Sequence, residues 1–287
     1  MRKAYAVDSS NISLFKAILK ASGRKSKDGN ERGGIKSHVQ ICLLDELPMN
    51  VKYTPGASSD HEFLKHLILE KDDIAIFDKA YVDYNQYGKW NKEGVYFVTR
   101  EKDNAKSISL LERDLPNDKD FEILLDEEVI KTYKDEQNQV RKMLLRRVVI
   151  WSDKHNAKIV LLTNIFYLDA SQISLLYRKR WRIELLFKQL KQNFPLKYFL
   201  GDNENAIQIQ IWRCLIVNLL ITVIKLKTAN KKMSFALTVS IIRQHLMRYI
   251  NIFEYLKYPQ GLRAEFKKSY PFRKNYNAQS DLFFNTG

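Results

Sequence analysis

Apolar and polar residues alternate over short stretches in the first hundred positions, a pattern typical of β-strands. Residues 3–10, KAYAVDSS, predict a strand that ends at Asp8. Residues 35–55 predict two strands joined by a turn near Asp45. The apolar run 73–81 predicts a strand that ends at Asp78, and residues 95–100 predict another.

Helical spacing of apolar residues separates these strands. Residues 60–69 predict a helix with Asp60 in the N-cap position, and residues 83–94 predict a helix that closes at Gly94. The order is therefore β-β-β-α-β-α-β. Antiparallel strands followed by alternating elements predict an α/β (α+β) fold, a mixed sheet flanked by helices.

The pattern then changes to four apolar strands, predicted within residues 101–165. A long helix at 170–194, stopped by Pro195, and two further helices at 205–226 and 235–250 follow. We expect four parts along the chain. They are the first part of a core at 1–100, a β-rich insertion at 101–165, the rest of the core at 166–228, and a basic helical region at 229–287.

The charge of the chain points to a polyanionic partner. Among 287 residues, 48 Lys and Arg stand against 33 Asp and Glu, a net charge of +15. Counting the sequence, residues 171–200 hold 7 basic and 1 acidic residue, and residues 224–274 hold 12 and 2. Such an excess favours nucleic acid, and less often an anionic membrane surface.

Cysteine usage and hydropathy fit a protein of the cytoplasm. Cys42 and Cys214 lie far apart in apolar surroundings, which suits neither a disulfide framework nor a metal knuckle. The longest apolar run, 214–224, is too short to span a bilayer and predicts a buried helix.

The helix predicted at 170–194 carries one acid among several bases. At 100° per residue, Tyr177, Arg180, Glu184 and Lys191 fall within a stripe of about 60°, and Lys188 borders it. The simplest interpretation is an exposed face with an Arg180–Glu184 pair four residues apart.

Two other acids change that interpretation. Asp8 and Asp78 each end an apolar strand; alone, each is more often a turn or cap residue than a ligand. Acids at strand ends meet at one rim of a sheet. With Glu184 they would complete a three-carboxylate site for two Mg²⁺ or Mn²⁺ ions, the arrangement that cleaves phosphodiesters.

These residues resemble those of a known family. The spacing Tyr177-x2-Arg180-x3-Glu184-x6-Lys191 resembles the Y-R-E-K signature of bacterial insertion-sequence transposases of the DDE type. Residues 6–15 and 74–81 resemble the segments that hold the first and second catalytic Asp. The element order is similar to their ribonuclease-H-like core, and their β-rich insertion also falls between the second Asp and the Glu.

The resemblance implies functional roles. Asp8, Asp78 and Glu184 would be catalytic and would ligate two Mg²⁺ or Mn²⁺ ions. DNA phosphates would be bound by Tyr177, Arg180, Lys188 and Lys191. Trp151 would hold a base and Arg100 would contact DNA, although Trp151 is more often core packing, and His38 is more often structural than an aid to catalysis. The reaction would be cleavage at the ends of the transposon, followed by transfer of the strand to target DNA, by a homodimer in the cytoplasm at the nucleoid.

The chain departs from the family at its start. Family members carry a helical DNA-binding domain before the first Asp, whereas here that Asp is residue 8. We therefore expect an N-terminally truncated member that lacks end recognition. The competing hypotheses are a non-catalytic DNA-binding remnant or inhibitor of transposition, a metal-dependent nuclease of the same fold, and a protein of the membrane surface. The last is disfavoured because the basic residues form no amphipathic stripe.

Overall fold

The structure is a computed structural model. It describes residues 2–13, 23–25, 31–116, 121–153, 156–194, 196, 198–201, 203–228, 233–247 and 251–257. The chain divides into two compact units, Met1–Leu215 and Ile216–Gly287, each of which is described by itself.

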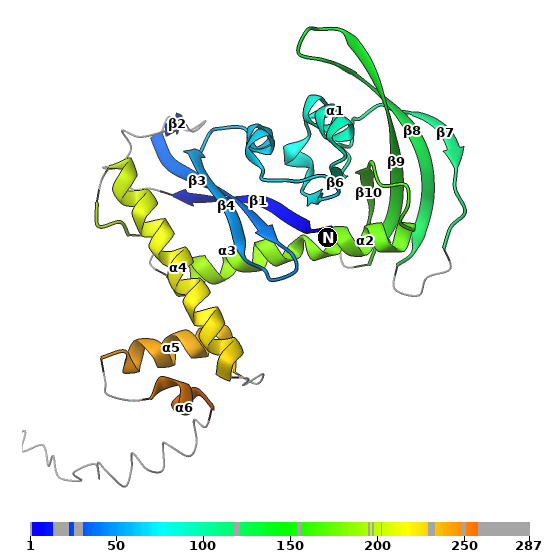
Figure 1. Ribbon diagram of the computed structural model, residues 1–287. Coiled ribbons are helices and arrows are strands. Elements are labelled where there is room, and N and C mark those ends of the chain that lie inside the picture. The colour runs from blue at the N-terminus through cyan, green and yellow to red at the C-terminus, as the bar shows by residue number, and fades with distance from the viewer. Residues whose placement is uncertain are drawn as a thin grey trace, which may run out of the picture. The chain divides into compact units, whose positions relative to one another are not determined.

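One sheet organises the first unit (Figure 1). In the described residues it has ten strands in the order β2-β3-β1-β5-β6-β10-β9-β8-β7, with β4 also paired to β3. The strands are β1 Ala4–Ser13, β2 Gly23–Lys25, β3 Glu31–Cys42, β4 Pro48–Pro55, β5 Ile74–Ile76, β6 Tyr96–Arg100, β7 Ile108–Glu112, β8 Ile123–Lys134, β9 Val140–Ser152 and β10 Ala157–Thr163.

The sheet is mixed in direction. Strand β1 runs antiparallel to β3 and parallel to β5, which in turn runs parallel to β6. The described strands of the β-rich insertion continue this sheet, because β10 pairs antiparallel with β6 and β9 pairs with β10. The carboxyl ends of β1, β5 and β6 therefore point to the same edge, and the acids that follow them lie there.

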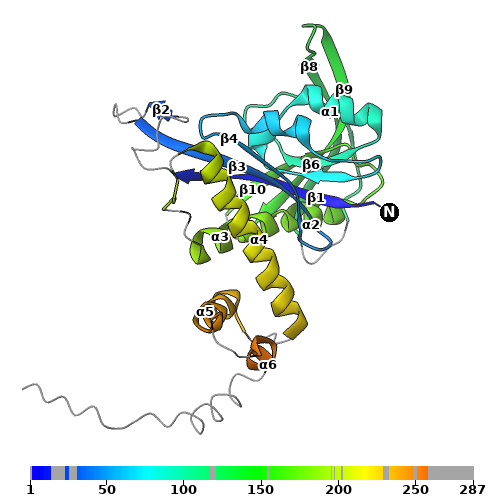
Figure 2. The same cartoon turned by 60° about the vertical axis from the view of Figure 1, so that its left-hand side comes forward.

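Helices cover both faces of the sheet (Figure 2). On one face lie α2, α3 and the beginning of α4; on the other lie two 3₁₀ helices, η2 and η3, and α1. The helices are η2 Asp60–His66, η3 Lys79–Tyr81, α1 Tyr84–Glu93, α2 Ala170–Lys179, α3 Trp181–Asn193, α4 Glu204–Thr228, α5 Phe235–His245 and α6 Ile252–Lys257.

Burial on both faces explains the apolar composition of β1. Ala6 packs in the core beside Ile183 of α3, while the next residue, Val7, packs on the opposite face beside Phe63 and Phe77. Because successive side chains of a strand point to opposite faces, both must be apolar when helices cover each side. The predicted mixed sheet, flanked by helices and with a β-rich segment before the helix that carries Glu184, is confirmed.

The predicted end of the first strand is wrong. Asp8 lies inside β1, which continues to Ser13 because β3 pairs with it as far as Gly34. The parallel pairing with β5, however, stops at Ala6. Asp8 is thus the second residue beyond the part of β1 that has a strand on both sides.

The helix predicted at 60–69 is a 3₁₀ helix that ends at His66. Its N-cap is Ser59, whose side chain makes no capping hydrogen bond. The Asp60 carboxylate instead accepts from the Ser9 hydroxyl and pairs with Lys36. The Asp60 carboxylate, which was predicted to cap the helix, therefore makes tertiary contacts instead.

The helix predicted at 170–194 is two helices, α2 and α3, which meet at Arg180. There the backbone turns more tightly than an α-helix, because Arg180 N–H donates to the Tyr177 carbonyl and Ile183 N–H donates to the Arg180 carbonyl. The proposed stop at Pro195 lies outside the described residues.

Helix α4 is longer and more exposed than predicted. Within the run 214–224, Cys214 and Leu215 lie in the core beside α3, as predicted. In the second unit Asn218 and Ile221 are also buried, but Ile216 and Leu220 are 52% and 58% exposed, so the buried-helix prediction is wrong for one face of that part. By length and composition alone, α4 is the one helix in the described residues that is long enough to cross a membrane, and core helices also meet this test.

Candidate active site

Asp8 is held at the carboxyl edge of the sheet by its neighbours. Its Oδ1 accepts the Ser9 backbone N–H at 2.8 Å, and its Oδ2 lies 3.5 Å from Nη1 of Arg180. Burial raises the pKa of the Asp8 carboxyl to about 6, against the opposing effect of Arg180. Glu184 and Asp78 raise this pKa further, which places negative charge from all three acids in one neighbourhood.

Asp78 follows β5 and caps the short helix η3. Its Oδ1 accepts the Lys79 backbone N–H at 2.8 Å. The Tyr177 hydroxyl of α2 donates to the same oxygen at 3.4 Å. Burial raises the pKa of the Tyr177 phenol, and the nearby Asp78 adds to the effect, so this hydroxyl stays protonated and acts as a donor.

Arg180 connects two of the three acids. Its Nη2 donates to Oε1 of Glu184 at 2.5 Å, while Nη1 faces Asp8. The guanidinium also lies over the Tyr177 ring, 5.5 Å from its centroid. The Arg180 side chain is 12% exposed, and its Nε has no hydrogen-bond partner among the described residues. The Arg180 side chain, at the tight turn between α2 and α3, thus contacts both β1 and α3.

The donor set fits hard divalent cations. The acids at this edge offer carboxylate oxygens, which are the ligands Mg²⁺ and Mn²⁺ prefer. Burial is the main cause of the raised pKa of Asp8, and the negative charges of Glu184 and Asp78 add to it; a bound cation would favour the ionised carboxylate. In the arrangement described, the Arg180 guanidinium lies between Asp8 and Glu184. Within the described part of the chain no three His, Cys, Asp or Glu side chains already form a metal-binding group.

The remaining predicted DNA-binding residues divide into two sets. Lys188 and Lys191 of α3 are exposed, and neither forms an ion pair with a residue that the structure describes. Arg100, at the end of β6, lies close enough to Tyr177 to lower the pKa of that phenol. Trp151 is different, because its neighbour Ile150 faces the α2 side and Trp151 therefore points to the opposite face of the sheet.

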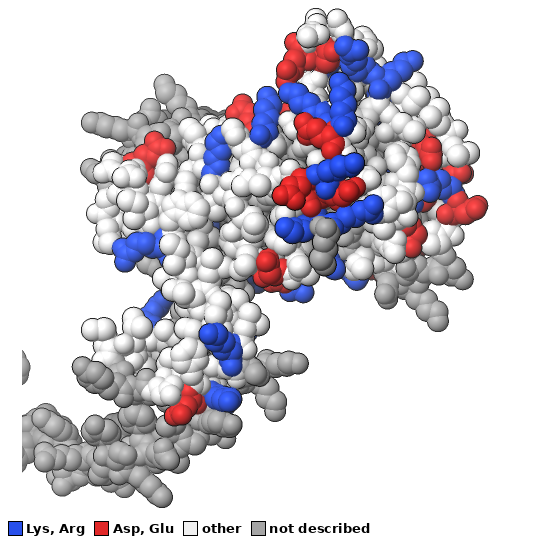
Figure 3. Space-filling model, viewed as in Figure 1, with Lys and Arg blue, Asp and Glu red and all other residues white. Residues whose placement is uncertain are grey.

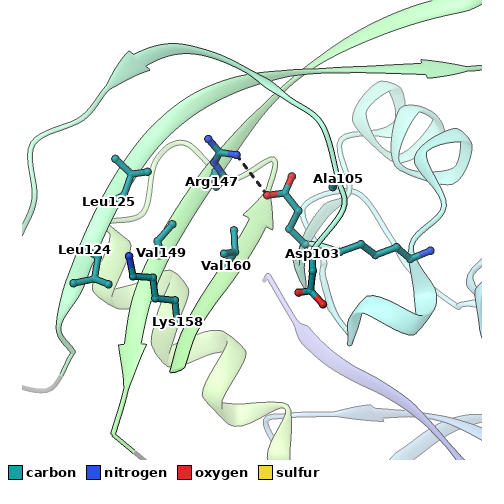
Figure 4. A pocket seen from close by; sticks show the side chains of 10 residues that line it. Asp103, Ala105, Leu124, Leu125, Arg147, Val149, Lys158 and Val160 are labelled. Atoms are coloured by element: carbon teal, nitrogen blue, oxygen red, sulfur yellow. Dashed lines mark ion pairs between the residues drawn. The ribbon is translucent and has the colours of Figure 1, made fainter. Parts of the chain in front are cut away.

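A cavity of about 500 Å³ lies on that opposite face, between β6, β8, β9 and β10 (Figure 4). Arg147 reaches into it and pairs with Glu101 at 3.7 Å, and Glu101 also pairs with the buried Lys131. On its rim, Asp103 pairs with Lys79, the residue after Asp78. Acidic and basic side chains are also interleaved on the face of the molecule that Figure 3 shows. Because Arg147 pairs with Glu101 and Lys79 pairs with Asp103, this cavity has no excess of positive charge that would bind a phosphate.

Sequence reasoning missed a polar cluster behind the strand edge. Asp60 contacts Ser9, Lys36 and His38, all from β1 and β3. The available signal was the polar pair Lys36 and His38 in a strand segment bounded by apolar Ile35 and Val39. The sequence does not identify their partner, since Asp60 is more than twenty residues away and had an apparent role as a cap.

Comparison with known proteins shows the family to which the chain belongs. A family model described as "Transposase DDE domain" matches residues 1–220. The chain belongs to this transposase family. Its predicted catalytic acids Asp8, Asp78 and Glu184 all lie within the matched residues, and the family prediction made from the Y-R-E-K spacing is confirmed.

Curated relatives of the chain are also named as transposases. The chain is 28% identical over 218 residues to a putative transposase, y4zB, of Sinorhizobium fredii, covering 76% of this chain and 59% of the relative. It is 28% identical over 197 residues to the probable transposase of the insertion sequence element IS5377 of Geobacillus stearothermophilus, covering 67% and 49%. A putative transposase for element IS4SA of Synechocystis is 30% identical over 197 residues, covering 65% and 52%. The chain thus spans about half to three-fifths of the length of these relatives.

Among solved structures, the chain is similar to the piggyBac transposase in a synaptic complex with hairpin DNA. The TM-score is 0.45 at 10% identity, with 95% of this chain and 55% of that chain covered. A similarity this low carries no information about residue roles.

Proposed function

We propose that this chain is the catalytic part of a DNA transposase. It would cleave phosphodiester bonds at the ends of a mobile element and join the freed 3′-hydroxyl to target DNA. The observation that carries the proposal is the meeting of Asp8, Glu184 and Arg180 at the edge of the sheet, with Asp78 tied to Tyr177 beside them.

The acids would hold the metal ions. Asp8, Asp78 and Glu184 would bind two Mg²⁺ or Mn²⁺ ions, which when bound activate the attacking oxygen and stabilise the leaving oxygen of a phosphodiester. The support is the chemistry of the donors and the effect of Asp78 and Glu184 on the pKa of Asp8.

The neighbouring donors would orient DNA. Arg180 carries a planar guanidinium suited to a phosphate, and its Nε is free of partners among the described residues. The Tyr177 hydroxyl, kept protonated by burial, would donate to a phosphate oxygen. Lys188 and Lys191 are exposed one turn apart on α3 and would follow the DNA backbone by charge.

A nicking assay tests this function. Supercoiled plasmid is incubated with the purified protein and Mn²⁺, and the open-circular product is measured. We expect nicking by the wild type, and a loss of at least about a hundredfold in Asp8→Asn, Asp78→Asn and Glu184→Gln, because each removes a ligand of the metal site.

The matched control is Glu204→Gln, which neutralises an exposed acid in the first turn of α4 and should nick like the wild type. Equal nicking by Glu184→Gln and the wild type would contradict the proposed site. A wild type that binds the plasmid without nicking it would favour the alternative, a non-catalytic DNA-binding protein that inhibits transposition.

A further inference from the structure

The Asp60 carboxylate contacts three polar side chains of β1, the strand that carries Asp8, and of its neighbour β3. Its Oδ1 accepts from the Ser9 hydroxyl at 2.7 Å, lies 3.1 Å from the Lys36 ammonium and lies 3.7 Å from Nδ1 of His38. The Lys36 ammonium also donates to the Ser58 carbonyl at 2.7 Å. These contacts fix η2 against β1 and β3.

Ser9 connects this cluster to the first acid. Its hydroxyl points to the Asp60 side of the sheet while its backbone N–H donates to Asp8 on the other side. Anchoring the Ser9 side chain therefore fixes the peptide that orients the Asp8 carboxylate. The anchor acts through the strand, because Asp60 makes no contact with Asp8 itself.

The segment of the second acid rests on the same cluster. Tyr81 closes the turn that begins at Asp78, donating its backbone N–H to the Asp78 carbonyl at 3.0 Å. Its buried ring lies edge-on to His38, with centroids 6.5 Å apart, and His38 in turn stacks on Phe63 of η2. Burial raises the pKa of the Tyr81 phenol, and the adjacent Ser9 hydroxyl opposes this rise.

We propose that Asp60 is a positioning residue that sets the separation of Asp8 and Asp78 and so controls how tightly the site binds divalent cations. Asp60 acts through Ser9 on Asp8, and through His38 and Tyr81 on the turn of Asp78. This inference rests on the proposed function, because it assumes that those two acids share metal ions. Residues that orient metal ligands typically change metal affinity by about 10- to 100-fold when removed.

Mn²⁺ binding, measured by isothermal titration calorimetry on the whole chain, tests this role without requiring catalysis. We expect Asp60→Ala to weaken Mn²⁺ binding by about tenfold, because the Ser9 anchor is lost. Asp60→Asn retains an oxygen that accepts from Ser9 and should bind Mn²⁺ within about twofold of the wild type. Glu62→Ala, at an exposed acid in the same turn of η2, is the matched control and should bind like the wild type.

Ser9→Ala gives a second, independent test that leaves the η2 cluster with its Lys36 contact. It should weaken Mn²⁺ binding in the same direction, and the Asp60→Ala/Ser9→Ala double variant should lose no more than Asp60→Ala alone, because the Ser9 side chain acts only through its bond to Asp60. If Asp60→Ala does not fold, the Ser9 variant decides the question.

Wild-type Mn²⁺ affinity in both Asp60→Ala and Ser9→Ala, even with a lowered melting temperature, would overturn the inference and leave Asp60 a structural residue. Glu184→Gln, measured in the same series, distinguishes failure of the Asp60 role from failure of the metal site. If Glu184→Gln binds Mn²⁺ as the wild type does, the proposed metal site itself fails.

Discussion

Arg180 is the counter-charge of the predicted catalytic acids. Its guanidinium is largely buried and contacts Asp8 and Glu184 at once. We expect Arg180→Ala, without divalent ions, to lower the free energy of unfolding by about 3 kcal/mol, since removing one partner of a buried ion pair leaves charge uncompensated. Urea unfolding in EDTA measures this loss.

Arg182 supplies the comparison within the same helix turn. It pairs with Glu46, but both side chains are more than half exposed, at 54% and 53%. Arg182→Ala should therefore change the free energy of unfolding by less than about 0.5 kcal/mol. Equal losses in the two variants would show that the Arg180 contacts carry no special electrostatic role.

His38 makes stability depend on pH. Burial, opposed by Asp60, lowers the pKa of this imidazole from 6.5 to about 4. Between pH 6.5 and about pH 4, the His38 imidazole therefore binds a proton in the unfolded chain but not in the folded chain. The free energy of unfolding consequently decreases as the pH falls through this window. Between pH 7 and pH 5 we expect the wild type to lose about 2 kcal/mol more than His38→Gln does. Urea unfolding at both pH values measures the difference, and parallel losses would contradict a buried neutral His38.

The sequence predicts the site residues whose contacts are local and misses those whose contacts are distant along the chain. Glu184, Arg180 and Tyr177 lie within eight positions, so helical periodicity alone predicts that they share a face. Asp60 and Ser9 are 51 positions apart, and their contact depends on how η2 packs on β1. No local pattern encodes that packing, which is why the polar cluster was missed.

At the scale of elements, the start of α2 fixes the position of Tyr177. Asp169 and Gln172 form a capping box, in which each side chain bonds to the other's backbone. Asp169→Ala should lower the free energy of unfolding by about 1 kcal/mol, because a backbone donor loses its partner. Asp169→Asn, which still caps, should remain close to the wild type. Thermal unfolding distinguishes them, and equal melting temperatures for Ala and wild type would exclude a stabilising cap.

Element types were easier to predict than element ends. Alternating and buried runs identified β1, β5 and β6, because both faces of the sheet are covered and the strands are apolar. The continuation of β1 to Ser13 was not predicted, since all but one of the residues 9–13 are polar and they are held by pairing with β3. The sequence also missed the tight turn between α2 and α3 at Arg180, where the helical pattern itself is unbroken and only the hydrogen bonding changes.

On the scale of the whole molecule, the charge of +15 predicts salt-sensitive binding of DNA. The affinity should fall linearly with salt on a logarithmic plot. The Lys188→Ala/Lys191→Ala variant should reduce the slope by about 2, one unit for each lost phosphate contact. Fluorescence anisotropy with a short duplex at several salt concentrations measures the slope.

Lys89→Ala is the control for this series, because the Lys89 ammonium already pairs with Glu136 at 3.0 Å. Its slope should equal that of the wild type. A slope unchanged by loss of Lys188 and Lys191 would place the DNA elsewhere than along α3.

The arrangement of the whole sheet was predicted only in outline. The mixed, helix-flanked core follows from the order of elements. The joining of β10 to β6, which merges the insertion into the core sheet, does not. That contact pairs strands about sixty positions apart, and an apolar pattern does not indicate which strand edge it will meet.

The central claim is that Asp8, Asp78 and Glu184 form one metal site. Electron paramagnetic resonance of free Mn²⁺, titrated against the protein without DNA, counts the bound ions. The account predicts two Mn²⁺ ions per wild-type chain and the same number for Glu204→Gln, but fewer for Asp8→Asn, Asp78→Asn and Glu184→Gln. An unchanged number of bound ions in all three of these variants would contradict it.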